Sequence, residues 1–219
     1  MESKSNYLIQ LYKSRKNLIS HLTHSGFDCT QYDGFNLEEL DVMRKYDQLS
    51  FKVSNTKTNE QCYVYYLVED TSGKKKGTSN LLKKNTIPDI VDEIYNDTAI
   101  LNKNDTLIII TTDYSADSIH ESIKNLWENE GIFIVIYNLK QLQINPMKHI
   151  MVPKHTRLTN QEKMEVYQKY NVERDSQMPQ ISRFDPIAKI LMMRPGEVCK
   201  IERFEKVSFN TDYYRVCVS

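Results

Sequence analysis

Residues 185–203 read DPIAKILMMRPGEVCKIER, and this segment decides the fold of the C-terminal part of the chain. Asp185 before Pro186 is typical of a helix start. An aspartate side chain can accept hydrogen bonds from the free backbone N–H groups of the first helical turn. Proline suits the first helical position because the backbone N–H that it lacks has no partner within the helix there. A turn that contains Gly196 ends this helix. Polar and apolar residues then alternate from 197 to 203, which predicts a half-buried strand with 212–218 as its partner. We expect Asp185, Pro186 and Gly196 to set this small α+β fold.

Upstream of this segment, Thr159 and Glu162 have the spacing of a capping box, in which each side chain accepts from the other residue's backbone amide. A helix is therefore expected from this point to about Asn171, ahead of the polar run 173–177. Its apolar stripe is Met164, Val166, Tyr167 and Tyr170.

Many spaced landmarks in this region resemble one family, the fifth subunit shared by eukaryotic nuclear RNA polymerases, whose C-terminal half corresponds to a small polymerase subunit of archaea. The opening helix resembles the same subunit in Leu11-Tyr12-x-x-Arg15-Lys16 and in the Gly26-Phe27 that closes it. The C-terminal landmarks are Val152-Pro153-Lys154-His155, Leu158, Glu162-Lys163, Tyr170, Gln177-Met178-Pro179, Ile181, Asp185-Pro186-Ile187-Ala188, Gly196-Glu197-Val198, Lys200-Ile201, Arg203 and Tyr214-Arg215.

The sequence departs from the family pattern at three places. The chain has Met192 and Phe209 where the family has glycine, before the strand and in the hairpin loop respectively. It has Glu205-Lys206 where the family usually has Ser-Glu. These departures concern loop contacts and leave the expected fold unchanged.

The resemblance implies a non-catalytic subunit of a multisubunit DNA-dependent RNA polymerase. It implies an N-terminal α/β jaw domain, residues 1–145, of restriction-endonuclease-like topology, and a C-terminal assembly domain, residues 146–219. The assembly domain would dock on the largest subunit, and the jaw would lie near downstream DNA. The residues expected at the docking surface are Arg203, Tyr214, Arg215 and His155.

Composition is that of a soluble globular protein, with 219 residues of which 40% are hydrophobic and 26% are charged. The longest apolar runs are too short for a membrane span, and the N-terminus does not resemble a signal peptide. The four cysteines include no Cys-x-x-Cys, so free thiols in an intracellular protein are expected rather than a zinc site or disulfides.

Charge is distributed unevenly although the total is zero. Residues 1–148 contain 17 Lys and Arg against 20 Asp and Glu, and residues 149–219 contain 12 against 9. Six of the eight arginines lie in the second part, and arginine suits bidentate contacts at interfaces. The C-terminal module is therefore the expected docking face, whereas the mildly acidic N-terminal part is a poor DNA binder by itself.

The N-terminal part carries patterns of both helices and strands. Helices are predicted over 5–24, from Asn36, and over 87–95, and residues 49–54 and 61–69 read as a hairpin. The strand 107–110, a helix capped by Ser115 and the strand 132–137 form a predicted βαβ unit, hence a partly parallel sheet.

Two groups of residues are candidates for proximity to DNA. Lys74, Lys75 and Lys76 form either a solvated loop tip or a contact to backbone phosphates. Ser115 and Ala116 match the family's turn near DNA, but Asp117 follows where the family has lysine, so contact there is expected to be weaker.

No enzymatic motif is present, and no catalytic residue, metal or cofactor is expected. His21 and His24 share a helix face without an evident third ligand. A magnesium nuclease would need an acidic residue and Glu/Asp-x-Lys on adjacent strands, but Asp89 opens a helix and the only Glu-x-Lys lies at Glu2-Ser3-Lys4. The alternatives are such a nuclease or a free adaptor protein with a polymerase-like module.

The expected partners are the largest polymerase subunit, other polymerase subunits and, through the assembled complex, downstream DNA. No membrane association and no homo-oligomer are expected. The expected location is the nucleus for a cellular protein, and a cytoplasmic viral factory, the nucleus or the virion for a viral one.

Overall fold

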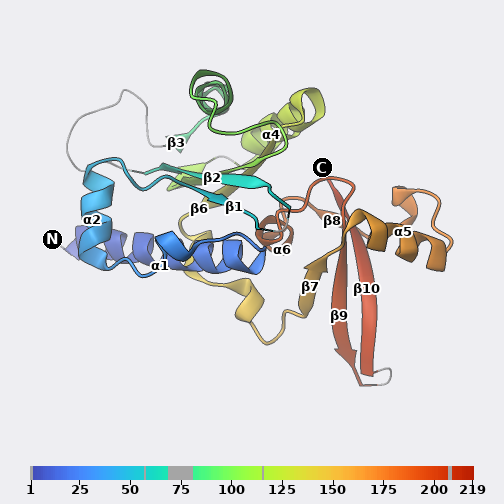
Figure 1. Ribbon diagram of the computed structural model, residues 1–219. Coiled ribbons are helices and arrows are strands. Elements are labelled where there is room, and N and C mark those ends of the chain that lie inside the picture. Colours follow the sequence, from blue (N-terminus) through green and yellow to red (C-terminus); the bar gives the residue numbers. More distant parts are fainter. Residues whose placement is uncertain (1, 57, 69–80, 115, 207–208) are drawn as a thin grey trace. The chain divides into compact units, whose positions relative to one another are not determined.

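The computed structural model describes residues 2–56, 58–68, 81–114, 116–206 and 209–219 (Figure 1). Contacts divide the chain into two compact units, Met1–Ile144 and Asn145–Ser219.

The N-terminal unit is built around a four-stranded sheet in the order β1-β2-β4-β6. Strand β1 is antiparallel to β2, and β2, β4 and β6 are parallel to one another. All six residues of β4 are buried, as is usual for a central parallel strand covered on both faces. The strands are β1 (Phe51–Ser54), β2 (Gln61–Leu67), β4 (Thr106–Thr111) and β6 (Phe133–Asn138).

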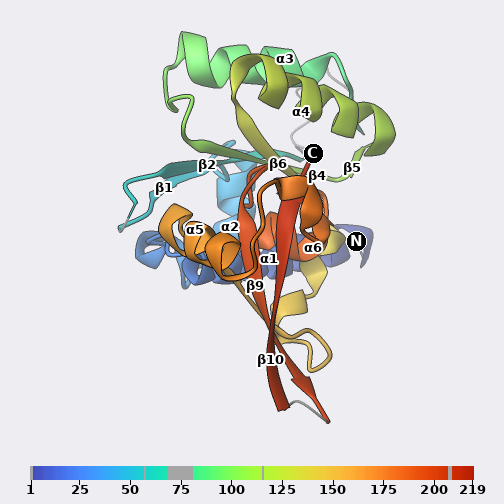
Figure 2. The same cartoon turned by 90° about the vertical axis from the view of Figure 1, so that its right-hand side faces the viewer.

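Helices lie on both faces of this sheet, with α1 on one face and α3 and α4 on the other (Figures 1 and 2). The leucines Leu11, Leu18 and Leu22 of α1 are fully buried, because they repeat on one side of the helix. The helical elements are α1 (Glu2–His24), η1 (Thr30–Tyr32), α2 (Leu37–Lys45), α3 (Thr86–Val91), the π-helical turn η2 (Asp92–Asp97), α4 (Ala116–Glu130) and η3 (Gln141–Gln143).

The predicted hairpin, the βαβ unit β4–α4–β6 and the helix start at Asn36 are confirmed, and Asn36 forms a capping box with Glu39. The predicted cap Ser115 lies outside the described residues. Two features were not predicted. A short parallel pair joins β3 (Leu81–Leu82) to β5 (Asp113–Tyr114), and the helix beginning at Thr86 widens into a π-helical turn.

The C-terminal unit contains a second four-stranded sheet in the order β7-β9-β10-β8. Strands β9 and β10 form an antiparallel hairpin, β7 is antiparallel to β9, and β8 is parallel to β10. The elements are η4 (Pro146–Lys148), β7 (Lys154–Arg157), α5 (Asn160–Lys169), η5 (Asp175–Gln177), β8 (Gln180–Ser182), α6 (Pro186–Ile190), β9 (Val198–Glu205) and β10 (Phe209–Val218).

Each face of this sheet carries its own small core, because side chains alternate along β9 and β10. On one face, Val198 and Val216 pack with Val166 of α5 and with Met178. The other core contains residues of β8, α6, β9 and β10: Ile181, Ala188, Leu191, Met193, Cys199, Ile201 and Cys217. The predicted capping box of α5, Thr159 with Glu162, is confirmed.

The two positions where the resemblance leads us to expect glycine, Met192 and Phe209, both have left-handed backbones. Met192 has a φ of 51° and Phe209 a φ of 55°. This conformation costs a non-glycine residue energy, because its Cβ approaches the following carbonyl. Met192 is buried and 4% exposed, whereas Phe209 is 67% exposed, so only Met192 gains burial in return.

Candidate functional site

Two of the predicted docking residues, Arg203 and Arg215, lie on one face of the β9–β10 hairpin. Arg203 pairs with Thr211 and Arg215 with Cys199, so both side chains share the face of Ile201 and Tyr213. The Cζ atoms of Arg203 and Arg215 are 4.8 and 5.8 Å from the ring centroid of Tyr213. We call Arg203, Tyr213 and Arg215 the arginine face.

Tyr214, the third predicted docking residue, lies on the opposite face of the hairpin. It pairs with Lys200, and its ring centroid is 5.9 Å from that of Tyr170. It packs against the core that contains Val166, and burial raises the pKa of its phenol. The structure therefore brings Arg203 and Arg215 together around Tyr213 and places Tyr214 away from them.

His155 lies on β7 directly opposite Ile201 and is 8% exposed. Its Nδ1 is 2.7 Å from the carbonyl oxygen of Pro153. The imidazole therefore lies on the same face of the sheet as the two arginines, but it is buried whereas they reach solvent. Such a residue can orient β7 more readily than it can reach a partner protein.

The residues expected to set the fold lie at both ends of α6. The Oδ1 of Asp185 accepts a hydrogen bond of 2.8 Å from the backbone N–H of Ile187, and Pro186 occupies the first helical turn. Gly196 has a φ of 89°, a conformation that favours glycine. Its carbonyl accepts a hydrogen bond of 2.8 Å from the Nζ of Lys163, which also pairs with Asp175.

Sequence reasoning missed two buried cations in this unit, Arg183 and Lys189, which are 4% and 7% exposed. Burial lowers the pKa of Arg183 to about 10 and that of Lys189 to about 8, and the nearby Asp185 partly opposes the shift of Lys189. Lys189 lies on the short apolar helix α6 between Ala188 and Ile190, which are both buried. The sequence signal for the burial of Lys189 is its position in a five-residue helix whose other residues are all apolar.

Of the residues expected near DNA, Lys74, Lys75, Lys76 and Ser115 lie outside the described residues. Ala116 and Asp117 begin α4, and both are exposed. An aspartate in the first turn of a helix stabilises that helix but repels phosphate, because it places a negative charge at the helix start.

The described part of the chain contains no group of three or more His, Cys, Asp or Glu side chains that could hold a metal ion. His21 of α1 is buried, and His24, one turn further, is exposed. All four cysteines are buried and none forms a disulfide. No helix in the described residues is both long and apolar enough to cross a membrane.

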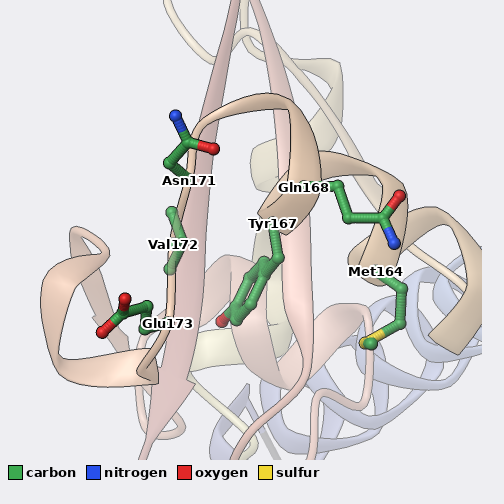
Figure 3. A pocket seen from close by; sticks show the side chains of 6 residues that line it. All are labelled: Met164, Tyr167, Gln168, Asn171, Val172 and Glu173. Atoms are coloured by element: carbon green, nitrogen blue, oxygen red, sulfur yellow. The ribbon is translucent and has the colours of Figure 1, made fainter.

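Figure 3 shows an open hollow at the C-terminal end of α5. The hydroxyl of Tyr167 donates a hydrogen bond of 2.8 Å to Asp175, and this contact serves the fold. No buried charged group lines the hollow. Its lining consists of Met164, Tyr167, Gln168, Asn171, Val172 and Glu173.

Comparisons with known proteins agree with the sequence resemblance. Residues 144–217 match the family model of the RNA polymerase Rpb5 C-terminal domain. The chain is 25% identical over 213 residues to the Dictyostelium discoideum protein named DNA-directed RNA polymerases I, II, and III subunit rpabc1, covering 97% of this chain and 98% of that protein. It is 37% identical over 76 residues to DNA-directed RNA polymerase subunit Rpo5 of Pyrococcus abyssi, covering 35% of this chain and 92% of that protein.

Proposed function

The chain belongs to the RNA polymerase Rpb5 family of non-catalytic polymerase subunits, and from this premise we propose that it docks on the largest subunit of its polymerase through its C-terminal unit. Other subunits of a multisubunit DNA-directed RNA polymerase are its partners. The observation that carries the proposal is the similarity to a shared polymerase subunit along 97% of the chain.

The assignment of docking to the C-terminal unit rests on two further observations. The archaeal relative is a polymerase subunit that corresponds to this unit alone. The unit also carries the arginine face, and arginine and tyrosine are both among the residue types enriched at interface hot spots. We therefore assign the residues from 146 onward to assembly and residues 1–145 to the jaw.

The N-terminal unit then lies near downstream DNA in the assembled enzyme. Its sheet, with parallel strands β2, β4 and β6, is compatible with the restriction-endonuclease-like topology expected from the resemblance. Local DNA contact would come from Lys74, Lys75 and Lys76 rather than from Ala116, because Asp117 adjoins it. In a eukaryotic cell, this function places the protein in the nucleus.

The proposal is tested by tagging the full chain at its N-terminus in its source cells and purifying it under native conditions. The expected result is a complex in which the largest polymerase subunit is present at about one copy per chain, with cross-links from the C-terminal unit to that subunit. A chain that elutes alone, or whose cross-links to the largest subunit come only from the N-terminal unit, contradicts the proposal.

A further inference from the structure

Part of the β9–β10 hairpin extends beyond the rest of its sheet (Figures 1 and 2). Strand β7 pairs with β9 only at residues 199–202, and β8 pairs with β10 only at residues 216–218. Residues 203–205 and 209–211 therefore form a two-stranded arm, and residues 212–215 of β10 continue an outer edge with which no described strand pairs. A two-stranded ribbon is marginally stable by itself in water, so an added strand would stabilise it.

On the outer edge of β10, the backbone N–H and C=O groups of alternate residues point away from β9. Cys217 donates its N–H to Glu197, in the direction of β9, whereas Val216 donates its N–H to Pro179, on the side of β8. The register from Val216 to Phe209 continues without a bulge, and backbone direction alternates along a strand. The N–H and C=O groups of Asn210 and Asp212 therefore face outward, where no described strand pairs with them.

The arginine face carries positive charge with which no carboxylate of the described residues forms an ion pair. Lys200 pairs with Asp212 at 2.9 Å, and Lys154 pairs with Glu202 at 3.2 Å. Neither Arg203 nor Arg215 forms an ion pair with a described carboxylate, and both are stacked against Tyr213. A matching surface would therefore bring carboxylates to this face, since bidentate contacts between arginine and carboxylate are both strong and directional.

The end of the arm presents two aromatic rings to solvent. Phe204 and Phe209 are 73% and 67% exposed, and their ring centroids are 6.3 Å apart. Phe209 also holds the left-handed backbone conformation described above. A bulky residue that is both strained and exposed does not serve the fold of the isolated chain, and such outliers point to functional sites.

We propose that the outer edge of β10 takes up an extended, acidic segment of another polymerase subunit as an added strand. The outward groups of Asn210 and Asp212 pair with its backbone, Arg203 and Arg215 bind its carboxylates, and the two phenylalanines cover apolar side chains. Strand addition of this kind takes affinity from main-chain hydrogen bonds and specificity from alternate side chains. The proposal rests on the proposed function and adds the chemistry of the partner segment.

Two other occupants fit the arm less well. A second copy of this edge would bring Phe209, Thr211, Tyr213 and Arg215 to the arginine face, and this set contains no carboxylate. A nucleic acid would satisfy the arginines but offers no alternating backbone donors and acceptors for Asn210 and Asp212. An extended acidic segment can pair with the outward backbone groups of β10 and can also bring carboxylates to the two arginines.

The test uses the tagged full chain in its source cells and compares Asp212→Pro with Asp212→Ala. Both variants lose the carboxylate that pairs with Lys200. Only proline removes the outward N–H, and an edge position tolerates it. The recovery of the largest polymerase subunit is expected to be about tenfold lower with proline than with alanine, because a strand-pairing bond is lost. Equal recovery with the two variants overturns the proposal.

A photo-activated amino acid in place of Asn210 gives a second measurement that does not depend on how the proline variant folds. The expected cross-link is to one extended segment of a polymerase subunit that contains acidic residues. Cross-links to another copy of this chain, to DNA, or to a basic segment overturn the proposal. If the unsubstituted chain recovers no polymerase subunit, the proposed function is wrong, and the proposal of an added strand, which rests on it, is wrong as well.

Discussion

Arg15 of the N-terminal unit and the arginine face of the C-terminal unit make the same kind of contact in opposite settings. In the N-terminal unit, Arg15 of α1 is 3% exposed, donates a hydrogen bond of 2.9 Å to the carbonyl of Leu49, and has its Cζ 4.6 Å from the ring centroid of Phe51. In the C-terminal unit, Arg203 and Arg215 stack on Tyr213 beside an open strand edge. The same cation–aromatic contact thus completes a core in one unit and leaves a charged surface in the other.

This difference is what our proposal expects, in which the N-terminal unit is stabilised by its own contacts and the C-terminal unit keeps some contacts for a partner. The fully buried strand β4 supports the first statement. The outer edge of β10 at residues 209–215, with which no described strand pairs, supports the second.

The largest expected effect is on the buried arginine. Arg15→Ala should lower the free energy of unfolding of the N-terminal unit by about 3 kcal/mol, since it removes a buried hydrogen bond and the packing on Phe51. Urea unfolding followed by the fluorescence of Trp127, the single tryptophan of the chain, measures this loss. Lys16→Ala, at the exposed neighbouring position, is the matched control and should change stability by less than about 0.5 kcal/mol. Equal effects would mean that Arg15 is not part of the core.

The buried Lys189 predicts a pH dependence in the C-terminal unit. Its folded pKa of about 8 is below the ordinary value of 10.5, so between these values the unfolded chain holds a proton that the folded chain has lost. Stability contributed by this group therefore rises as pH increases from 8 to 10.5 and is lowest below pH 8. Lys189→Met should stabilise the unit at pH 7 by about 2 kcal/mol and remove this rise.

Thermal unfolding of both proteins at pH 7 and pH 10, followed by circular dichroism, measures the Lys189 effect. The comparison between them isolates Lys189 from the other titrating groups. An unchanged slope of stability against pH in Lys189→Met would show that the lysine is solvated.

Gly196→Ala should destabilise the C-terminal unit by about 1 kcal/mol, through backbone conformation alone. The φ of Gly196 is 89°, and a Cβ built there would meet only Asp175 Oδ2, at 3.8 Å, so no steric clash adds to the cost. Chemical denaturation followed by far-ultraviolet circular dichroism measures the loss. A loss several times larger would indicate that the turn carries packing contacts not evident from its geometry.

Phe209→Gly separates stability from docking within the arm. Glycine relieves the left-handed strain at a φ of 55°, so the unit should gain up to about 0.5 kcal/mol in stability. Recovery of the largest polymerase subunit should nevertheless fall, because an exposed aromatic anchor is lost. If Phe209→Gly raises both the stability of the unit and the recovery of the largest subunit, Phe209 does not contribute to docking.

Much of the fold could be predicted from the sequence, because long elements carry periodic patterns. Helix α1 repeats leucine on one face, and β4 and β6 are continuous apolar runs. Strands β7 and β8 were not predicted, because they contain only four and three residues and depend on pairing with β9 and β10. Local sequence signals are weak for strands this short.

The docking role of Arg203, Tyr214, Arg215 and His155 stays a prediction, and the structure adds the geometry that the sequence did not contain. Arg203 and Arg215 share a face as their spacing along the hairpin allows, but the aromatic residue between them is Tyr213 rather than Tyr214. Consecutive strand residues point to opposite faces, so the choice between two neighbouring tyrosines depends on the register with β9. Because that register cannot be read from the sequence, the sequence alone does not show which of Tyr213 and Tyr214 lies beside the two arginines.

Two charge reversals in the tagged full chain test whether the arginine face holds the chain in its polymerase, as we propose. Arg203→Glu with Arg215→Glu should lower recovery of the largest polymerase subunit by about tenfold or more, because like charges then face the partner's carboxylates. Reversal of Lys74, Lys75 and Lys76 to glutamate should leave that recovery unchanged and lower only salt-sensitive DNA retention. Undiminished recovery with the arginine reversals, together with loss on reversal of the lysines, would contradict the account.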